Sequence, residues 1–195
     1  MILGVMSDTH DNIELAQRCV ELMVNKYNVK TIVHLGDDMS DLERIDTHGF
    51  PVITVPGIYE AAWKNKNIPN RIIKEFDGVV FLFSHTPNRV SQDGKGAINP
   101  EKARRSYGVD VLLHGHTHTH LALESEDGLI VINPGHLKSN VDRSNEASFA
   151  ILDFNDEKLK VMFISPGDRL LESDEFDVHP SGIMNSEDST TVEID

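Results

Sequence analysis

Short apolar runs recur along this chain, and four of them end near a residue that can bind a metal ion. Each run is five residues long, which suits a buried β-strand better than a helix. Four such strand ends in one short chain are much less frequent by chance than any one of them. The runs and their polar followers are Ile2–Met6 with Asp8 and His10, Thr31–Leu35 with Asp37, Val79–Phe83 with His85, and Val109–Leu113 with the histidines at 114, 116, 118 and 120.

The first half of the chain alternates predicted strands and helices. Ile13–Tyr27 carries apolar residues at spacings of three and four, which predicts an amphipathic helix with Asp11 or Asn12 as its cap. A short helix near Ser40–Arg44 and a strand at Pro51–Val55 follow. This order predicts an α/β protein with a parallel sheet flanked by helices.

The second half reads as a series of mostly antiparallel hairpins. Asp77-Gly78 between two apolar runs is a strong hairpin signal, and a helix is expected over Pro100–Tyr107. We predict three hairpins: Arg71–Phe76 with Val79–Ser84, Leu121–Glu124 with Leu129–Asn133, and Ser148–Phe154 with Lys158–Ile164.

The charge of the chain limits its partners. It has 18 Lys+Arg against 32 Asp+Glu and a formal net charge of −14, which disfavours binding of a nucleic-acid polymer through a broad basic face. Residues 165–195 hold nine acidic residues and one basic residue. We therefore expect one domain over residues 1–165 and an acidic C-terminal extension over 166–195, partly disordered and mobile beyond about residue 180.

Cysteine content and the N-terminal segment point to a cytoplasmic location. Cys19 is the single cysteine, so no disulfide forms within the chain, as suits a reducing compartment. The first apolar run is too short for a signal peptide or a membrane span, and we expect no membrane partner.

The candidate site residues each allow a second interpretation. Asp8 and His10 suit a divalent cation, although Asp8 could instead cap a helix. Asp37 could bridge two metals or belong to an ordinary turn. His85 could be a ligand or a hydrogen-bonded histidine at the rim.

Gly115-His116-Thr117-His118 is the most specific element, because alternate residues on an extended chain point to one side. His114 is expected to be packed, and His120 to line the rim.

The ordered series Asp8-x-His10, Gly36-Asp37, His85 and Gly115-His116-x-His118 resembles the calcineurin-like metallophosphoesterases. The Ser7-to-Asn12 opening and Ile132-Asn133-Pro134-Gly135 are similar to the small prokaryotic YfcE-like phosphodiesterase branch. The resemblance spans residues 1–164 and implies a four-layer α-β-β-α sandwich with mixed sheets.

The resemblance also implies a site with two divalent metal ions. One metal would be held by Asp8, His10, Asp37 and His118, and the other by Asp37, His85 and His116. The family completes the second set with an asparagine in a Gly-Asn-x-Asp/Glu motif, where this chain has Gly57-Ile58-Tyr59-Glu60. Glu60 is the candidate substitute ligand.

The implied function is a dinuclear metal-dependent phosphoesterase, specifically a phosphodiesterase, in which a metal-bridging hydroxide hydrolyses the P–O bond of a small phosphoester. Mn²⁺ is the expected metal, with Ni²⁺, Fe²⁺, Zn²⁺, Co²⁺ and Mg²⁺ as alternatives. The branch suggests a homodimer or homotetramer.

The alternative is a catalytically impaired scaffold or binding module, with residues 58–63 as an apolar interface. The segment Asn88–Asn99 is a candidate mobile lid.

Overall fold

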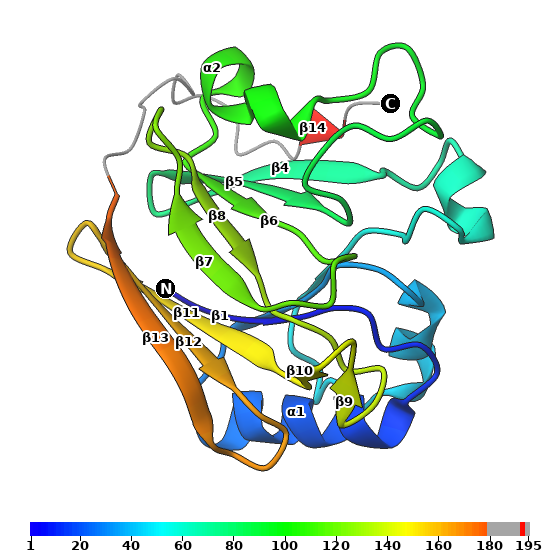
Figure 1. Ribbon diagram of the computed structural model, residues 1–195, viewed down its shortest axis with the longest axis vertical. Coiled ribbons are helices and arrows are strands. Elements are labelled where there is room, and N and C mark those ends of the chain that lie inside the picture. Colours follow the sequence, from blue (N-terminus) through cyan, green and yellow to red (C-terminus); the bar gives the residue numbers. More distant parts are fainter. Residues whose placement is uncertain (179–191, 194–195) are drawn as a thin grey trace.

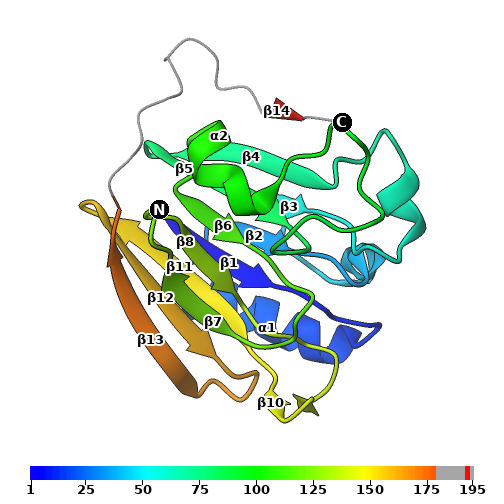
Figure 2. The same ribbon diagram turned by 45° about the horizontal axis from the view of Figure 1, so that its top comes forward.

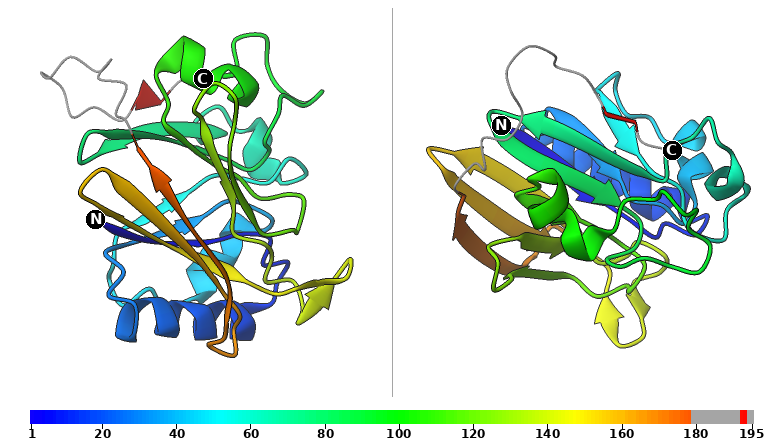
Figure 3. Two further views of the ribbon diagram at one scale, coloured as in Figure 1. Left: turned by 60° about the vertical axis from the view of Figure 1, so that its left-hand side comes forward. Right: turned by 90° about the horizontal axis from the view of Figure 1, so that it is seen from above.

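Two six-stranded sheets packed face to face form the body of the protein (Figure 1). The computed structural model describes residues 1–178 and 192–193. The first sheet runs β13 (Leu170–Asp177), β12 (Lys158–Ile164), β11 (Phe149–Asn155), β1 (Ile2–Met6), β2 (Thr31–His34) and β3 (Val52–Thr54). The second runs β14 (Val192–Glu193), β4 (Arg71–Phe76), β5 (Val79–Ser84), β6 (Val111–Leu113), β8 (Ile130–Asn133) and β7 (Leu121–Glu124). A small hairpin of β9 (Val141–Asp142) and β10 (Asn145–Glu146) projects from this body (Figure 3).

Helices cover the two outer faces of the sheet pair. The helix α1 (Ile13–Asn25) lies against the first sheet, and α2 (Ala103–Tyr107) lies over the second (Figures 1 and 2). The layers are therefore α-β-β-α with mixed sheets, which confirms the predicted fold class. Short 3-10 helices occupy the connections: η1 (Met39–Arg44), η2 (Ala61–Lys64) and η3 (Pro100–Lys102).

The alternation of side chains along each strand supplies two core layers at once. In β1, Leu3 and Val5 pack between the sheets, whereas Met6 packs on the side of α1. In β5, Phe81 and Phe83 face the first sheet, and Leu82 joins the cluster beneath α2. A strand buried on both faces must be apolar throughout, which explains the unbroken apolar runs in the sequence.

Parallel strands occupy one end of the first sheet and the centre of the second. In the first sheet β2 pairs in parallel with β1 and β3. In the second, β6 pairs in parallel with β5 and β8, so the predicted antiparallel character of the second half is incomplete. The three predicted hairpins are present, and β8 serves both as the second strand of a hairpin and as a parallel neighbour of β6. The carboxyl ends of the parallel strands are the ends that carry the candidate site residues.

The strand β13 was not expected from the sequence. Residues 170–177 fall within the segment assigned to an acidic extension, yet they pair with β12 along its whole length. Leu171 and Phe176 pack partly against the core between the sheets, while Glu172, Glu175 and Asp177 are exposed. The expected mobility beyond residue 180 concerns residues that lie outside the described part, apart from 192–193.

No helix in the described ranges is long and apolar enough to cross a membrane.

Candidate metal centre

The six residues singled out in the sequence come together at the carboxyl ends of β1, β2, β5 and β6. They form two groups in which the potential ligand atoms all lie within 4.8 Å of one another. One group is Asp8, His10, Asp37 and His118, and the other is Asp37, His85 and His116. Asp37 belongs to both groups, so the division coincides with the two ligand sets that the resemblance implies.

The first group brings two imidazoles and two carboxylates to one point. His118 Nε2 lies 3.1 Å from Asp8 Oδ1 and 3.3 Å from His10 Nε2. His10 Nε2 is 3.8 Å from Asp37 Oδ2. All four side chains thus bring a nitrogen or oxygen atom to a common space.

The second group is centred on a fully buried histidine. His85 Nδ1 lies 2.7 Å from the carbonyl oxygen of Leu35, which can only accept, so Nδ1 carries the proton. The Nε2 of His85 is therefore unprotonated in the neutral ring, and it lies 3.5 Å from Asp37 Oδ2. The ring of His116 is 5.1 Å from that of His85, centroid to centroid.

Two buried atoms in this site have no hydrogen bond, one in each group. They are Asp8 Oδ1 and His85 Nε2. Buried polar atoms in proteins are almost always paired, and an unpaired one needs an explanation. Both atoms are lone-pair donors that face other lone-pair donors, an arrangement that a divalent cation relieves and a water molecule does not fully relieve. The residues present therefore fit a metal centre.

The backbone of the site is held in an unusual conformation. The φ angles are positive at five of the six candidate ligands: 55° at Asp8, 47° at His10, 46° at Asp37, 68° at His116 and 62° at His118. Non-glycine residues adopt this left-handed region rarely, and strain of this kind gathers at functional sites. The turns between strand and following segment thus aim these side chains inward.

Two glycines permit the close approach of the loops. A Cβ at position 57 would lie 1.8 Å from Asp37 Oδ1, and one at position 115 would lie 1.9 Å from Ser7 Oγ. Any side chain at either position would therefore displace a candidate ligand loop.

The electrostatic environment favours the metal-binding form of Asp8 and His116, whereas the hydrogen bond to Asp8 raises the pKa of His118. Burial raises the pKa of Asp8, but the neighbouring His118 and His85 imidazoles and the Ser7 hydroxyl outweigh it, so the pKa is lowered. Burial and the adjacent His85 both lower the pKa of His116 and favour its neutral form. An ionised carboxylate and a neutral imidazole are the forms that bind metals.

Sequence reasoning missed the residues that orient these ligands. His118 Nδ1 lies 2.5 Å from Asp142 Oδ2 on the β9–β10 hairpin, which fixes the tautomer and leaves Nε2 for the centre. Asn133 donates from Nδ2 to Gly115 O at 3.0 Å and to Thr117 Oγ1 at 2.8 Å, which holds the turn that carries both histidines. Asn133 belongs to the segment Ile132–Gly135, which resembles the YfcE-like branch. Nothing in the sequence around Asp142 indicates that it contacts a metal ligand.

Glu60 has a different role from the predicted substitute ligand. Its carboxylate accepts hydrogen bonds from the backbone N–H groups of Asp37, Met39 and Gly57. These bonds tie the loop after β3 to the loop after β2, and Glu60 is in neither ligand group.

The proposed apolar interface at residues 58–63 is not a surface patch. Ile58 and Trp63 are 6% and 4% exposed, whereas Tyr59 is 80% exposed. A single exposed aromatic side chain does not make a contiguous apolar face.

The remaining predictions near the site have mixed outcomes. His114 is buried, with Nδ1 3.0 Å from Gly115 O, as expected for a packed residue. The ring of His120 lies tilted against that of Phe163, with 5.1 Å between the ring centroids, and His120 is outside both groups. In the candidate lid at 88–99 the side chain of Asp93 is fully buried and accepts a hydrogen bond from Arg71 at 2.8 Å, which anchors this segment to β4.

Comparison with known proteins places the chain in a family. Residues 1–157 match the calcineurin-like phosphoesterase superfamily domain. Phosphodiesterase MJ0936 of Methanocaldococcus jannaschii is 29% identical over 148 residues, which cover 69% of this chain and 83% of that relative. The E. coli phosphoesterase Yfce superposes with a TM-score of 0.65 at 20% identity, covering 92% of this chain and all of the other (100%). Vps29 of Chaetomium thermophilum gives a TM-score of 0.66 at 14% identity, covering 92% and 98% of the two chains. At such identities the structural likeness shows the fold alone, while the sequence match spans most of the chain, and the protein therefore belongs to the calcineurin-like phosphoesterase superfamily.

Proposed function

We propose that this protein is a metal-dependent phosphodiesterase that binds two divalent cations, Mn²⁺ first among them, and hydrolyses a small phosphodiester. One observation carries the proposal: two ligand groups share Asp37, and each holds a buried atom without a hydrogen bond, Asp8 Oδ1 and His85 Nε2. The name of the Methanocaldococcus jannaschii relative, a phosphodiesterase, supports the reaction class.

The candidate ligands differ in solvent exposure, which suggests the side from which a substrate approaches. Asp8 and His85 are fully buried, whereas the side chains of His10 and Asp37 are 29% and 13% exposed. His116, a member of the second group, is half-buried. A phosphodiester would therefore reach the centre from the side of His10 and His116.

Hydrolysis at this site needs no nucleophilic side chain. Two divalent cations, when bound, would supply positive charge for the phosphoryl oxygens and acidify a water molecule. The chain's part is to hold Asp37 between the two groups and to keep both imidazole tautomers fixed. Cys19 lies on the buried face of α1, and burial raises the pKa of its thiol, so it is not poised to attack.

Paired histidine variants test this function. We expect metal-dependent hydrolysis of a bis-aryl phosphate by the purified protein with Mn²⁺, and loss of the activity in EDTA. His116→Ala should lower the rate at least about 100-fold by removing a ligand. His120→Ala, in the same segment but outside both groups, is the matched control and should retain the rate. Absence of metal-dependent turnover, or equal losses in both variants, would sink the proposal.

A substitution at Ile58 tests the second ligand group separately. Ile58 is buried but belongs to none of the three hydrophobic clusters. Ile58→Asn introduces an amide oxygen where the family motif has one, and we expect a higher metal content per chain and a faster rate. Unchanged stoichiometry and rate would show that this position does not face the centre.

A further inference from the structure

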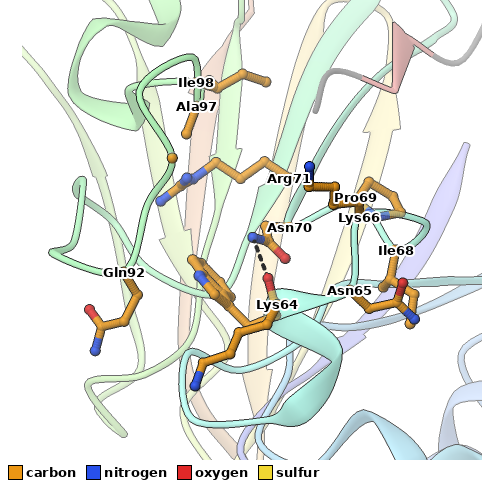
Figure 4. A pocket seen from close by; sticks show the side chains of 12 residues that line it. Lys64, Asn65, Lys66, Ile68, Pro69, Asn70, Arg71, Gln92, Ala97 and Ile98 are labelled. Atoms are coloured by element: carbon orange, nitrogen blue, oxygen red, sulfur yellow. Dashed lines mark hydrogen bonds between the residues drawn. The ribbon is translucent and has the colours of Figure 1, made fainter.

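Arg71, at the start of β4, is a buried cation beside the strand end that carries the candidate ligand His85. Its side chain is 2% exposed, and the buried carboxylate of Asp93 accepts two hydrogen bonds from it, at 2.8 and 3.1 Å. The side chain extends across a cavity of about 280 Å³, between Ala97 and Ile98 on one side and Asn70 on the other (Figure 4). With open space along it, the guanidinium is oriented by its hydrogen bonds more than by close packing.

The guanidinium holds both chain neighbours of His85. Arg71 Nε donates to Ser84 Oγ at 3.1 Å, and Nη2 donates to Thr86 Oγ1 at 3.2 Å. Ser84 Oγ in turn donates to the carbonyl oxygen of Thr86 at 2.8 Å, which closes the turn around the histidine. One planar fork thus fixes the residues before and after His85, and with them the point where its side chain leaves the backbone.

The same turn is bonded to the segment that carries the other histidine of the second ligand group. The carbonyl oxygen of His85 accepts from Gly115 N at 3.0 Å, directly before His116 in the chain. His85 and His116 are the two histidines that join Asp37 in that group. In the described ranges, none of the hydrogen bonds of Arg71 goes to a chain neighbour of the three ligands confined to the first group.

Anchoring of the loop at residues 88–99 is the simpler role for this arginine. That role needs only the ion pair with Asp93, which a lysine could keep. The simultaneous contacts with Ser84 and Thr86 require the fork, because an ammonium group is a point charge on a single stem. The choice of arginine therefore favours a role at the Ser84–Thr86 turn in addition to the loop.

We propose that Arg71 is a positioning residue for the second metal. Its guanidinium sets the turn over residues 84–86, and through that turn the directions of His85 and His116. This role rests on the proposed function, because it requires a divalent cation at the group formed by Asp37 and these two histidines. Its consequence is selective, since a change at Arg71 weakens binding of the second metal and spares the first.

Calorimetric titration of the full metal-free chain with Mn²⁺, in the absence of substrate, tests this role. Arg71→Lys keeps a charge opposite Asp93 and loses the fork, so we expect the affinity of the second group to fall about 10-fold. The affinity of the first group should be unchanged. His116→Ala, which removes a second-group ligand, shows which binding event belongs to that group. Arg104→Lys is the matched control, because Arg104 pairs with the buried Asp110 at the opposite end of β6, and it should change neither affinity.

Ser84→Ala is a second variant that leaves the buried ion pair intact. It removes the acceptor of Arg71 Nε and should also weaken the second group selectively. Combined with Arg71→Lys it should add little, because both changes break the same contact. Urea denaturation shows whether each variant is folded, and Ser84→Ala alone decides the outcome if Arg71→Lys is not.

Binding of a single metal by the unmodified chain, an unchanged second affinity in the folded variants, or equal weakening of both groups would overturn the proposal. Selective weakening in a chain that hydrolyses no phosphodiester would support the role of Arg71 and refute the phosphodiesterase function. The two failures are therefore distinguishable.

Discussion

At the scale of single residues, the candidate metal centre depends on which imidazole nitrogen is left without a proton. Leu35 O fixes His85, and Asp142 fixes His118, each through Nδ1. Both rings then direct Nε2 toward the shared Asp37 or toward Asp8. Hydrogen bonds of this kind orient metal-binding histidines and raise their basicity.

Asp142→Asn tests this orientation. The amide no longer holds a proton on His118 Nδ1 as the carboxylate does, and we expect Mn²⁺ affinity to fall about 10–100-fold with little change in fold. Isothermal titration calorimetry of the metal-free protein measures it. Asp156→Asn, in the turn between β11 and β12, is the control and should bind as the unmodified chain does. Unchanged affinity in Asp142→Asn would show that Asp142 does not act through His118.

A buried histidine beneath the site predicts a pH dependence of stability. Burial lowers the pKa of His34 from 6.5 to about 4, and its Nε2 lies 3.1 Å from Thr9 Oγ1. Between these pH values the unfolded chain takes up a proton that the folded chain does not, so the free energy of unfolding falls as the pH falls. The full contribution is about 3 kcal/mol.

Urea unfolding in EDTA at neutral and mildly acidic pH measures this effect. We expect His34→Gln, which keeps a donor for Thr9, to flatten the pH dependence by about 1.4 kcal/mol per pH unit within the window. A parallel pH dependence in the variant and the unmodified chain would contradict the assignment to His34.

The six candidate ligands were predictable because each follows an apolar strand at short and regular spacing. Their supporting residues were not, because the contacts are made in space. Asp142 lies 24 residues from His118 in the sequence, on a two-residue strand too short to show any alternation. The partners of Glu60 were not predictable either, because a motif position does not reveal whether a carboxylate faces a cation or backbone N–H groups.

At the scale of elements, the positions of strands were easier to predict than their pairing in the sheets. Five-residue apolar runs identified β1, β2, β5 and β6 within two residues. Parallel pairing of β6 with β5 and β8 depends on crossovers and leaves no local pattern. The strand β13 was hidden because its acidic residues outnumber the two apolar ones that reach the core.

The loop at residues 88–99 owes its order to one buried ion pair. Arg71 and Asp93 have side chains 2% and 0% exposed. Asp93→Ala leaves the guanidinium buried without its partner, and we expect a loss of about 3–5 kcal/mol in the free energy of unfolding. The exposed pair of Glu146 and Arg169 gives the control, since Glu146→Ala should cost at most about 1 kcal/mol. Urea denaturation compares them, and faster tryptic cleavage at Arg89 should accompany the Asp93 variant. Equal, small losses would show that the loop is held by other contacts.

At the scale of the whole molecule, the acidic surface is arranged along an open sheet edge. In the described ranges β13 pairs only with β12, so its outer side presents backbone groups to solvent. Glu172, Glu175 and Asp177 are exposed on this strand. Charged residues on an edge strand oppose pairing with another chain. Part of the net charge of −14 thus lies on this strand edge, where it opposes association of two copies of the chain.

Neutralising that edge tests the barrier. Glu172→Gln with Glu175→Gln leaves β13 in place, because both side chains are exposed, and removes two negative charges from the strand with which a second copy would pair. We expect the mass measured by light scattering to rise with protein concentration more steeply than for the unmodified chain. Glu14→Gln with Glu101→Gln makes the same change in net charge on α1 and η3, away from any strand edge, and should not alter the mass. If both double variants associate alike, net charge alone controls assembly; if neither does, the backbone of β13 is not a competent edge and its acidic residues serve only solubility.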